Sequence, residues 1–124
     1  MLTFTPLEKS VLDAICKAEY ATLPSLSEVL SNARIMSRDN TGHGFYTEFQ
    51  TYACATSGAL WPSMIDGPSV RMLDMGDNAL MGFILWCSES GPTTLEGYQL
   101  GDSVGNTIDL RERDLTKLRF RAIE

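Results

Sequence analysis

The first 20 residues carry a helical pattern. Apolar residues recur at the three- to four-residue spacing of one helical face: Leu7, Val11, Ala14, Ile15 and Ala18. Ahead of this face, Thr5 and Glu8 have the spacing of a capping box, and Pro6 suits the first helical position. The charged residues, Glu8 among them, lie mostly off the apolar face. The pattern predicts a helix that ends near residue 20.

A second, shorter helix is predicted over residues 25–32. Ser25 and Glu28 repeat the capping-box spacing, and Leu26 and Leu30 contribute to an apolar face. Both predicted helices therefore lie in the first quarter of the chain.

The pattern then changes to one typical of strands. Residues 33–39 and 45–52 are rich in bulky, aromatic and Thr side chains, and a short glycine-bearing loop joins them, which predicts a β-hairpin. The second run alternates, so that one face holds Phe45, Thr47 and Phe49 and the other holds Tyr46, Glu48 and Gln50.

Three further strands are predicted over residues 70–75, 80–88 and 93–100, and residues 53–69 are expected to form a long connection. The run 80–88 is almost wholly apolar, which indicates a central strand buried on both faces. Residues 116–123 alternate apolar and basic side chains and favour an edge strand, with a terminal helix as the alternative.

Two helices followed by a series of strands predict an α+β fold. We expect the two N-terminal helices to pack on one face of an antiparallel sheet of about five to six strands. The length of 124 residues and the hydrophobic share of 44% fit a single globular domain over residues 1–124.

The charge balance limits the partners. A formal net charge of −6 and a pI of about 4.7 oppose binding to nucleic acid and favour a basic protein partner. The longest apolar run has nine residues, too short to span a membrane as a helix. Three widely spaced cysteines and one histidine indicate neither a disulfide framework nor a metal site, so we expect a reduced, cytoplasmic protein without a cofactor.

His43 lies between two glycines in the predicted hairpin loop. The absence of a following Lys-Ser/Thr and helix argues against a phosphate loop, and a turn residue is favoured over a binding loop or a catalytic base. Arg38 and Glu48 flank this loop and are predicted to form a cross-strand pair on a solvated face, the alternative being an anion contact and a base.

Glu96 and Tyr98 are predicted to lie together on the strand face opposite Leu95. The alternative hypothesis is a small enzyme or ligand-binding domain with a polar pocket on the sheet. Its candidate lining is Arg38, His43, Tyr46, Glu48, Glu96 and Tyr98.

The two tryptophans are assigned differently. Trp86, in the apolar run, is expected in the core, whereas Trp61, in the Gly/Pro-rich connection, is expected to be exposed and to anchor a partner.

Two blocks resemble a pattern in small bacterial proteins of no established function. The first is Thr41-Gly42-x-Gly44-Phe45 with Thr47-x-Phe49, and the second is Gly82-Phe83-x-Leu85 followed by Leu95-Glu96-Gly97-Tyr98 and Gly101. Together they span residues 33–101. The resemblance implies a compact α+β domain of bacterial origin and carries over no catalytic residue.

The sequence therefore favours a non-enzymatic interaction or regulatory module of the immunity type. Its acidic patch is expected to draw on Asp66, Asp74, Asp77, Glu89, Glu96 and Asp102. Homo-oligomerisation through an exposed strand edge is a third possibility.

Overall fold

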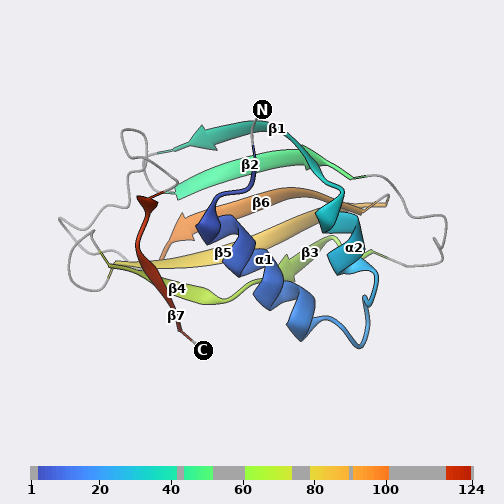
Figure 1. The fold of residues 1–124 in the computed structure, drawn as a ribbon, viewed down its shortest axis with the longest axis horizontal. Coiled ribbons are helices and arrows are strands. Elements are labelled where there is room, and N and C mark those ends of the chain that lie inside the picture. The colour runs from blue at the N-terminus through green and yellow to red at the C-terminus, as the bar shows by residue number, and fades with distance from the viewer. Residues whose placement is uncertain are drawn as a thin grey trace.

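The computed structural model describes residues 3–41, 44–51, 61–73, 79–89, 91–100 and 117–123. Within these ranges, two helices precede seven strands that form one antiparallel sheet (Figure 1). The helices are α1 (Pro6–Ala18) and α2 (Leu26–Ser31). The strands are β1 (Arg34–Asn40), β2 (Gly44–Gln50), β3 (Met64–Asp66), β4 (Ser69–Met72), β5 (Leu80–Ser88), β6 (Gly91–Gln99) and β7 (Phe120–Ile123). The predicted α+β class and antiparallel sheet are confirmed, but the sheet is larger than expected.

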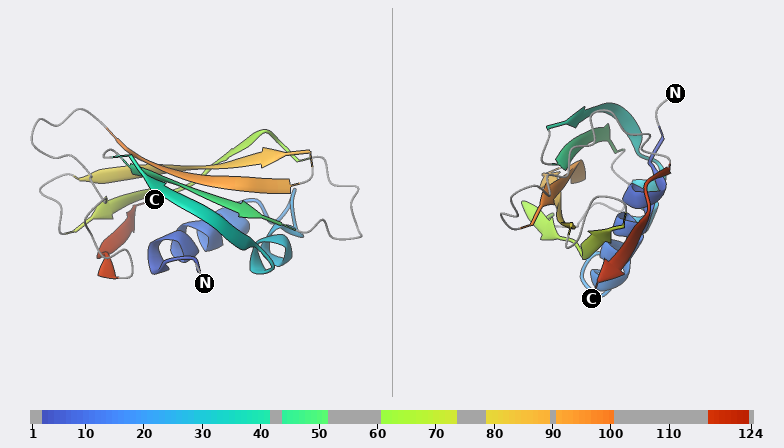
Figure 2. Two further views of the ribbon diagram at one scale, coloured as in Figure 1. Left: turned by 90° about the horizontal axis from the view of Figure 1, so that it is seen from above. Right: turned by 90° about the vertical axis from the view of Figure 1, so that its left-hand side faces the viewer.

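The strands are ordered β1-β2-β6-β5-β4-β7, and β3 also pairs with β5. β5 is therefore central, with β6 along one edge and β4 and β3 along the other. Figure 2 shows the strands as an arc with both helices on its inner side. The core fills the space between helices and sheet with apolar side chains from both, such as Leu7, Ile15, Phe83, Leu85 and Leu95.

The local start of α1 follows its sequence signal. The Thr5 hydroxyl accepts a hydrogen bond from the Glu8 backbone N–H at 3.2 Å, and Glu8 Oε1 accepts one from the Thr5 N–H at 2.8 Å. This confirms the predicted capping box. The capping box predicted at α2 is wrong, because Ser25 is itself in a helical conformation and its side chain makes no capping hydrogen bond.

Two predictions about the strands are corrected. β3 lies within the stretch expected to be a connection, where three extended residues suffice to pair with β5. The prediction that residues 80–88 are buried on both faces is also wrong. Phe83 and Leu85 point inward and are buried, but Trp86 points outward and is 37% exposed, because the helices pack only on the inner side.

The C-terminal segment forms the predicted edge strand and not the alternative helix. β7 pairs antiparallel with β4, from Ser69↔Ile123 to Met72↔Phe120. It closes one end of the sheet, and β1 forms the other end.

We expect Gly44→Ala to lower the free energy of unfolding by about 2 kcal/mol or more. Gly44 begins β2 at φ +143°, and a Cβ there would lie 2.0 Å from the backbone oxygen of Gly97, which cannot move aside without distorting β6. Urea denaturation measures the loss, and Gln50→Ala, at an exposed position of the same strand, is the control. Equal stabilities of the two variants would contradict this reading of the hairpin.

Candidate functional site

A buried ion pair joins α1 to the β1–β2 hairpin. The Arg38 guanidinium donates to both oxygens of the Glu8 carboxylate, from Nη2 to Oε1 at 2.6 Å and from Nε to Oε2 at 3.1 Å. The Thr47 hydroxyl donates to Glu8 Oε2, and Arg38 Nη2 also donates to the backbone oxygen of Thr3 at 3.1 Å. Only 1% of the Glu8 side chain and 10% of the Arg38 side chain are exposed. Each charge is therefore compensated inside the protein.

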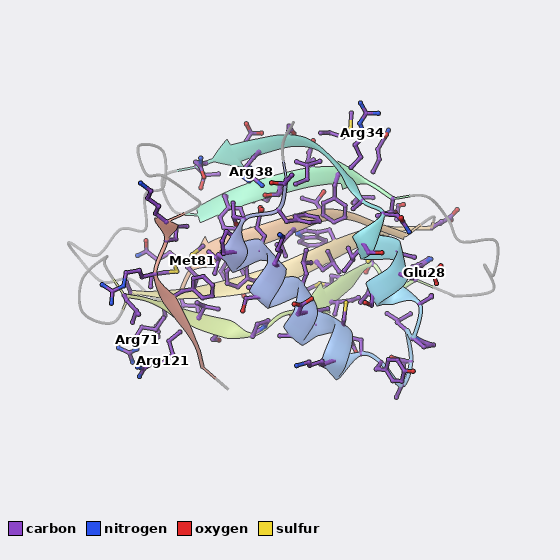
Figure 3. All side chains as sticks on the ribbon, in the orientation of Figure 1. Glu28, Arg34, Arg38, Arg71, Met81 and Arg121 are labelled. Atoms are coloured by element: carbon purple, nitrogen blue, oxygen red, sulfur yellow. The ribbon has the colours of Figure 1, made fainter. Side chains whose placement is uncertain are left out.

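This geometry overturns the pairing predicted for Arg38 and Glu48. Arg38 is opposite Thr47 and faces inward beside α1 (Figure 3). Glu48 is on the opposite face and accepts a hydrogen bond from the Ser37 hydroxyl at 3.3 Å. The signal that sequence reasoning missed was Thr47, a polar residue on the predicted apolar face of the hairpin. Because its Nε and Nη2 groups are bound to Glu8 and Thr3 on the inner side, Arg38 does not reach the outer face of the sheet.

The outer face of the sheet carries two aligned cross-strand rows. One row is Asp39, Tyr46, Glu96, Ile84 and Asp66, and the next is Ser37, Glu48, Thr94, Trp86 and Met64. We call these ten residues the outer patch. The patch combines four carboxylates with three exposed large apolar side chains, Tyr46, Met64 and Trp86, and includes no cationic residue.

Glu96 lies at the centre of the outer patch. Its Oε1 accepts a hydrogen bond from the indole Nε1 of Trp86 at 3.0 Å, and its carboxylate is also hydrogen-bonded to the Tyr46 hydroxyl. This hydrogen bond raises the pKa of Tyr46 above its ordinary value, with smaller contributions from the negative charge of Glu96 and from burial. Tyr46 therefore remains a protonated donor at neutral pH.

Tyr98 extends this cluster along β6. Its ring lies over Gly82 of β5, since a Cβ built on Gly82 would be 2.6 Å from both the Cζ and the hydroxyl oxygen of Tyr98. Glu96 and Tyr98 share the outer face, as the alternation predicted. Tyr46 and Trp86 thus interact with the Glu96 carboxylate, and Tyr98 lies two residues from Glu96 along β6.

The other predicted site residues are more dispersed. Asp66 is exposed at the end of the first row. The prediction that Trp61 is exposed is wrong, because its ring packs against the core and is half buried. His43, Asp74, Asp77 and Asp102 lie outside the described residues. Trp86 was expected in the core and is instead the indole on the outer face.

Two basic side chains lie away from the outer patch. Arg71 and Arg121 are cross-strand neighbours in β4 and β7 (Figure 3). Arg71 is opposite Leu80 of β5, and Glu96 is opposite Ile84 of the same strand. Leu80 and Ile84 are four residues apart, which is about 13 Å along β5. This separation exceeds the screening length of about 8 Å at physiological salt, so these arginines do not neutralise the patch.

The helical side of the protein carries a groove of about 1110 Å³ between α1, α2 and the start of β1. Leu12, Leu30 and Ile35 contribute apolar lining, and Cys16 also borders the groove. Burial, and to a lesser extent Asp13, raises the pKa of the Cys16 thiol, and burial raises that of Cys87 to about 11. Both thiols are therefore protonated and weakly nucleophilic at neutral pH.

In the described part of the chain, no three His, Cys, Asp or Glu residues are grouped so that they could hold a metal ion. None of the helices described there has the length and apolar character needed to cross a bilayer. Comparison with protein families, curated proteins and solved structures finds no match to this chain.

We expect Glu8→Gln to destabilise the protein by about 3–5 kcal/mol, because it leaves the largely buried Arg38 without a counter-charge. Thr47→Val, which removes only one hydroxyl, should cost about 1–2 kcal/mol. Urea denaturation gives both values, with Glu28→Gln on the exposed side of α2 as the matched control. A loss no larger for Glu8→Gln than for Glu28→Gln would show that the pair does not contribute to stability.

We expect Glu96→Gln to lower the pKa of Tyr46 toward its ordinary value, because the charged acceptor is lost. Because the pKa of Tyr46 is higher in the folded than in the unfolded protein, the hydrogen bond to Glu96 stabilises the fold. This stabilisation is fully present below the unfolded pKa of about 10 and is lost as the pH rises through the folded pKa. Ultraviolet titration of phenolate formation follows the change, and Tyr46→Phe identifies which transition belongs to Tyr46. Glu48→Gln is the control, and an equal shift in both variants would rule out the direct contact.

Proposed function

We propose that this chain is a non-enzymatic interaction module of the regulatory or immunity type, which binds a basic protein partner through the outer patch. The observation that carries the proposal is the composition of that patch. Three of the six large apolar side chains exposed in the described residues lie there, beside four carboxylates. An exposed apolar cluster with a polar surround is typical of a protein-binding surface.

Charge favours a basic partner over other classes. The patch holds four acidic residues, and the whole chain has a net charge of −6, so the local and overall fields have the same sign. Such a field accelerates encounters with a positively charged surface and opposes approach of a phosphate backbone. The exposed rings of Tyr46 and Trp86 add the apolar contact area that stabilises a complex after the encounter.

The enzyme alternative lacks its main cation. An anion-binding or catalytic arrangement on the polar sheet face was expected to use Arg38, and this side chain is held by Glu8 on the inner side of the sheet. The remaining candidates in the described part of that face, Tyr46, Glu48, Glu96 and Tyr98, are acids and phenols. They suit recognition of a cation better than chemistry on an anion.

We expect the immobilised protein to retain a basic protein from an extract of its source organism and to release it by about 0.5 M salt, as screening weakens the attraction. The fourfold variant D39N/E48Q/D66N/E96Q should retain none of it, because the patch has lost its charge. Quantitative mass spectrometry of the eluates measures retention, and circular dichroism verifies that the variant is folded. Retention that is insensitive to both salt and these substitutions would refute the proposal.

A further inference from the structure

We propose that Glu96, Tyr46 and Trp86 form a receptor for a single guanidinium group, an arginine side chain of the basic partner. This inference rests on the proposed function, which it deepens by naming the residue type that the patch receives. It depends on how these three side chains are arranged on β2, β5 and β6 rather than on the total charge of the face.

The Glu96 carboxylate has acceptor capacity to spare. A carboxylate offers about four lone-pair sites, and Trp86 Nε1 and the Tyr46 hydroxyl account for two of them. Both donors are neutral, so they orient the carboxylate without cancelling its charge. No cationic side chain of the described residues forms an ion pair with Glu96. Because Glu96 is also partly exposed, the remaining acceptors and the full charge are accessible from solvent.

The aromatic side chains determine the kind of cation. Tyr46 and Trp86 are 40% and 37% exposed, and both interact with the Glu96 carboxylate. Tyr98 lies over Gly82, on the other side of Glu96 from Trp86. Aromatic rings attract cations through their π-electrons, and the planar guanidinium stacks on rings while it donates to a carboxylate. An ammonium group is more strongly hydrated and lacks this planar match. The receptor should therefore prefer arginine to lysine.

The flanking acids serve a different purpose from Glu96. Asp39 and Asp66 end the row that Glu96 centres, and Glu48 is in the next row. Adjacent strands are about 4.8 Å apart, so the backbone positions of these acids are about 8–10 Å from that of Glu96. At this distance, close to or beyond the screening length, they add a weak general field and do not contact the bound cation. Since only Glu96 contacts two of the rings, the four acids are not equivalent.

NMR titration with Nα-acetyl-arginine amide tests the receptor. The indole N–H of Trp86 reports directly on the site, and Trp86→Phe distinguishes its signal from that of Trp61. We expect a saturable shift of the Trp86 signal, with Nα-acetyl-lysine amide binding about threefold or more weakly. Glu96→Gln should weaken arginine binding by about fivefold or more, and Glu48→Gln, the same change on the same face, by less than twofold.

The outcomes separate this inference from the proposed function. If the wild-type protein retains a basic partner but Glu96→Gln and Glu48→Gln weaken arginine binding equally, the receptor is refuted and the general acidic interface stands. A non-saturable response to the arginine derivative also refutes the receptor. If arginine binds as expected but no basic protein is retained, the cation site stands and the proposed protein partner fails.

Discussion

The contact between Glu8 and Arg38 determines which side of the hairpin faces the helices. Successive strand residues point to opposite faces, so placing Arg38 and Thr47 against α1 directs Asp39, Tyr46 and Glu48 outward. A one-residue slip would bring these polar side chains into the core and leave the Glu8 charge buried without a partner. The buried pair therefore fixes the register on which the outer patch depends.

Acidic residues occupy two contrasting environments in this protein. Glu8 is buried and its charge is compensated by Arg38, while Glu96 is partly exposed and meets only neutral donors. The first arrangement holds elements together and leaves little capacity for an external ligand. The second retains its charge and its open acceptors. The distinction depends on the neighbours of each carboxylate, since the residue type is the same.

Local signals in the sequence predicted much of the fold. The capping box of α1, the hairpin and the C-terminal strand each follow from spacing within a few residues. The buried pair was missed because its residues are 30 positions apart and belong to different elements. The exposure of Trp86 was missed because an apolar run does not show whether a second layer covers its outer face. Sequence alternation placed Glu96 and Tyr98 together, but the donors that reach Glu96 come from the neighbouring strands.

The outer patch combines an apolar cluster with charges of one sign, and under the proposed function this combination would determine which partners bind. Exposed Tyr46, Met64 and Trp86 alone would favour contact with any apolar surface, including the same face of a second copy. Two such faces would also bring eight carboxylates together without a counter-ion, and like-charge contacts across an interface are costly. The acids therefore disfavour contact between two copies of this face, and under the proposed function its apolar side chains would contact a basic surface.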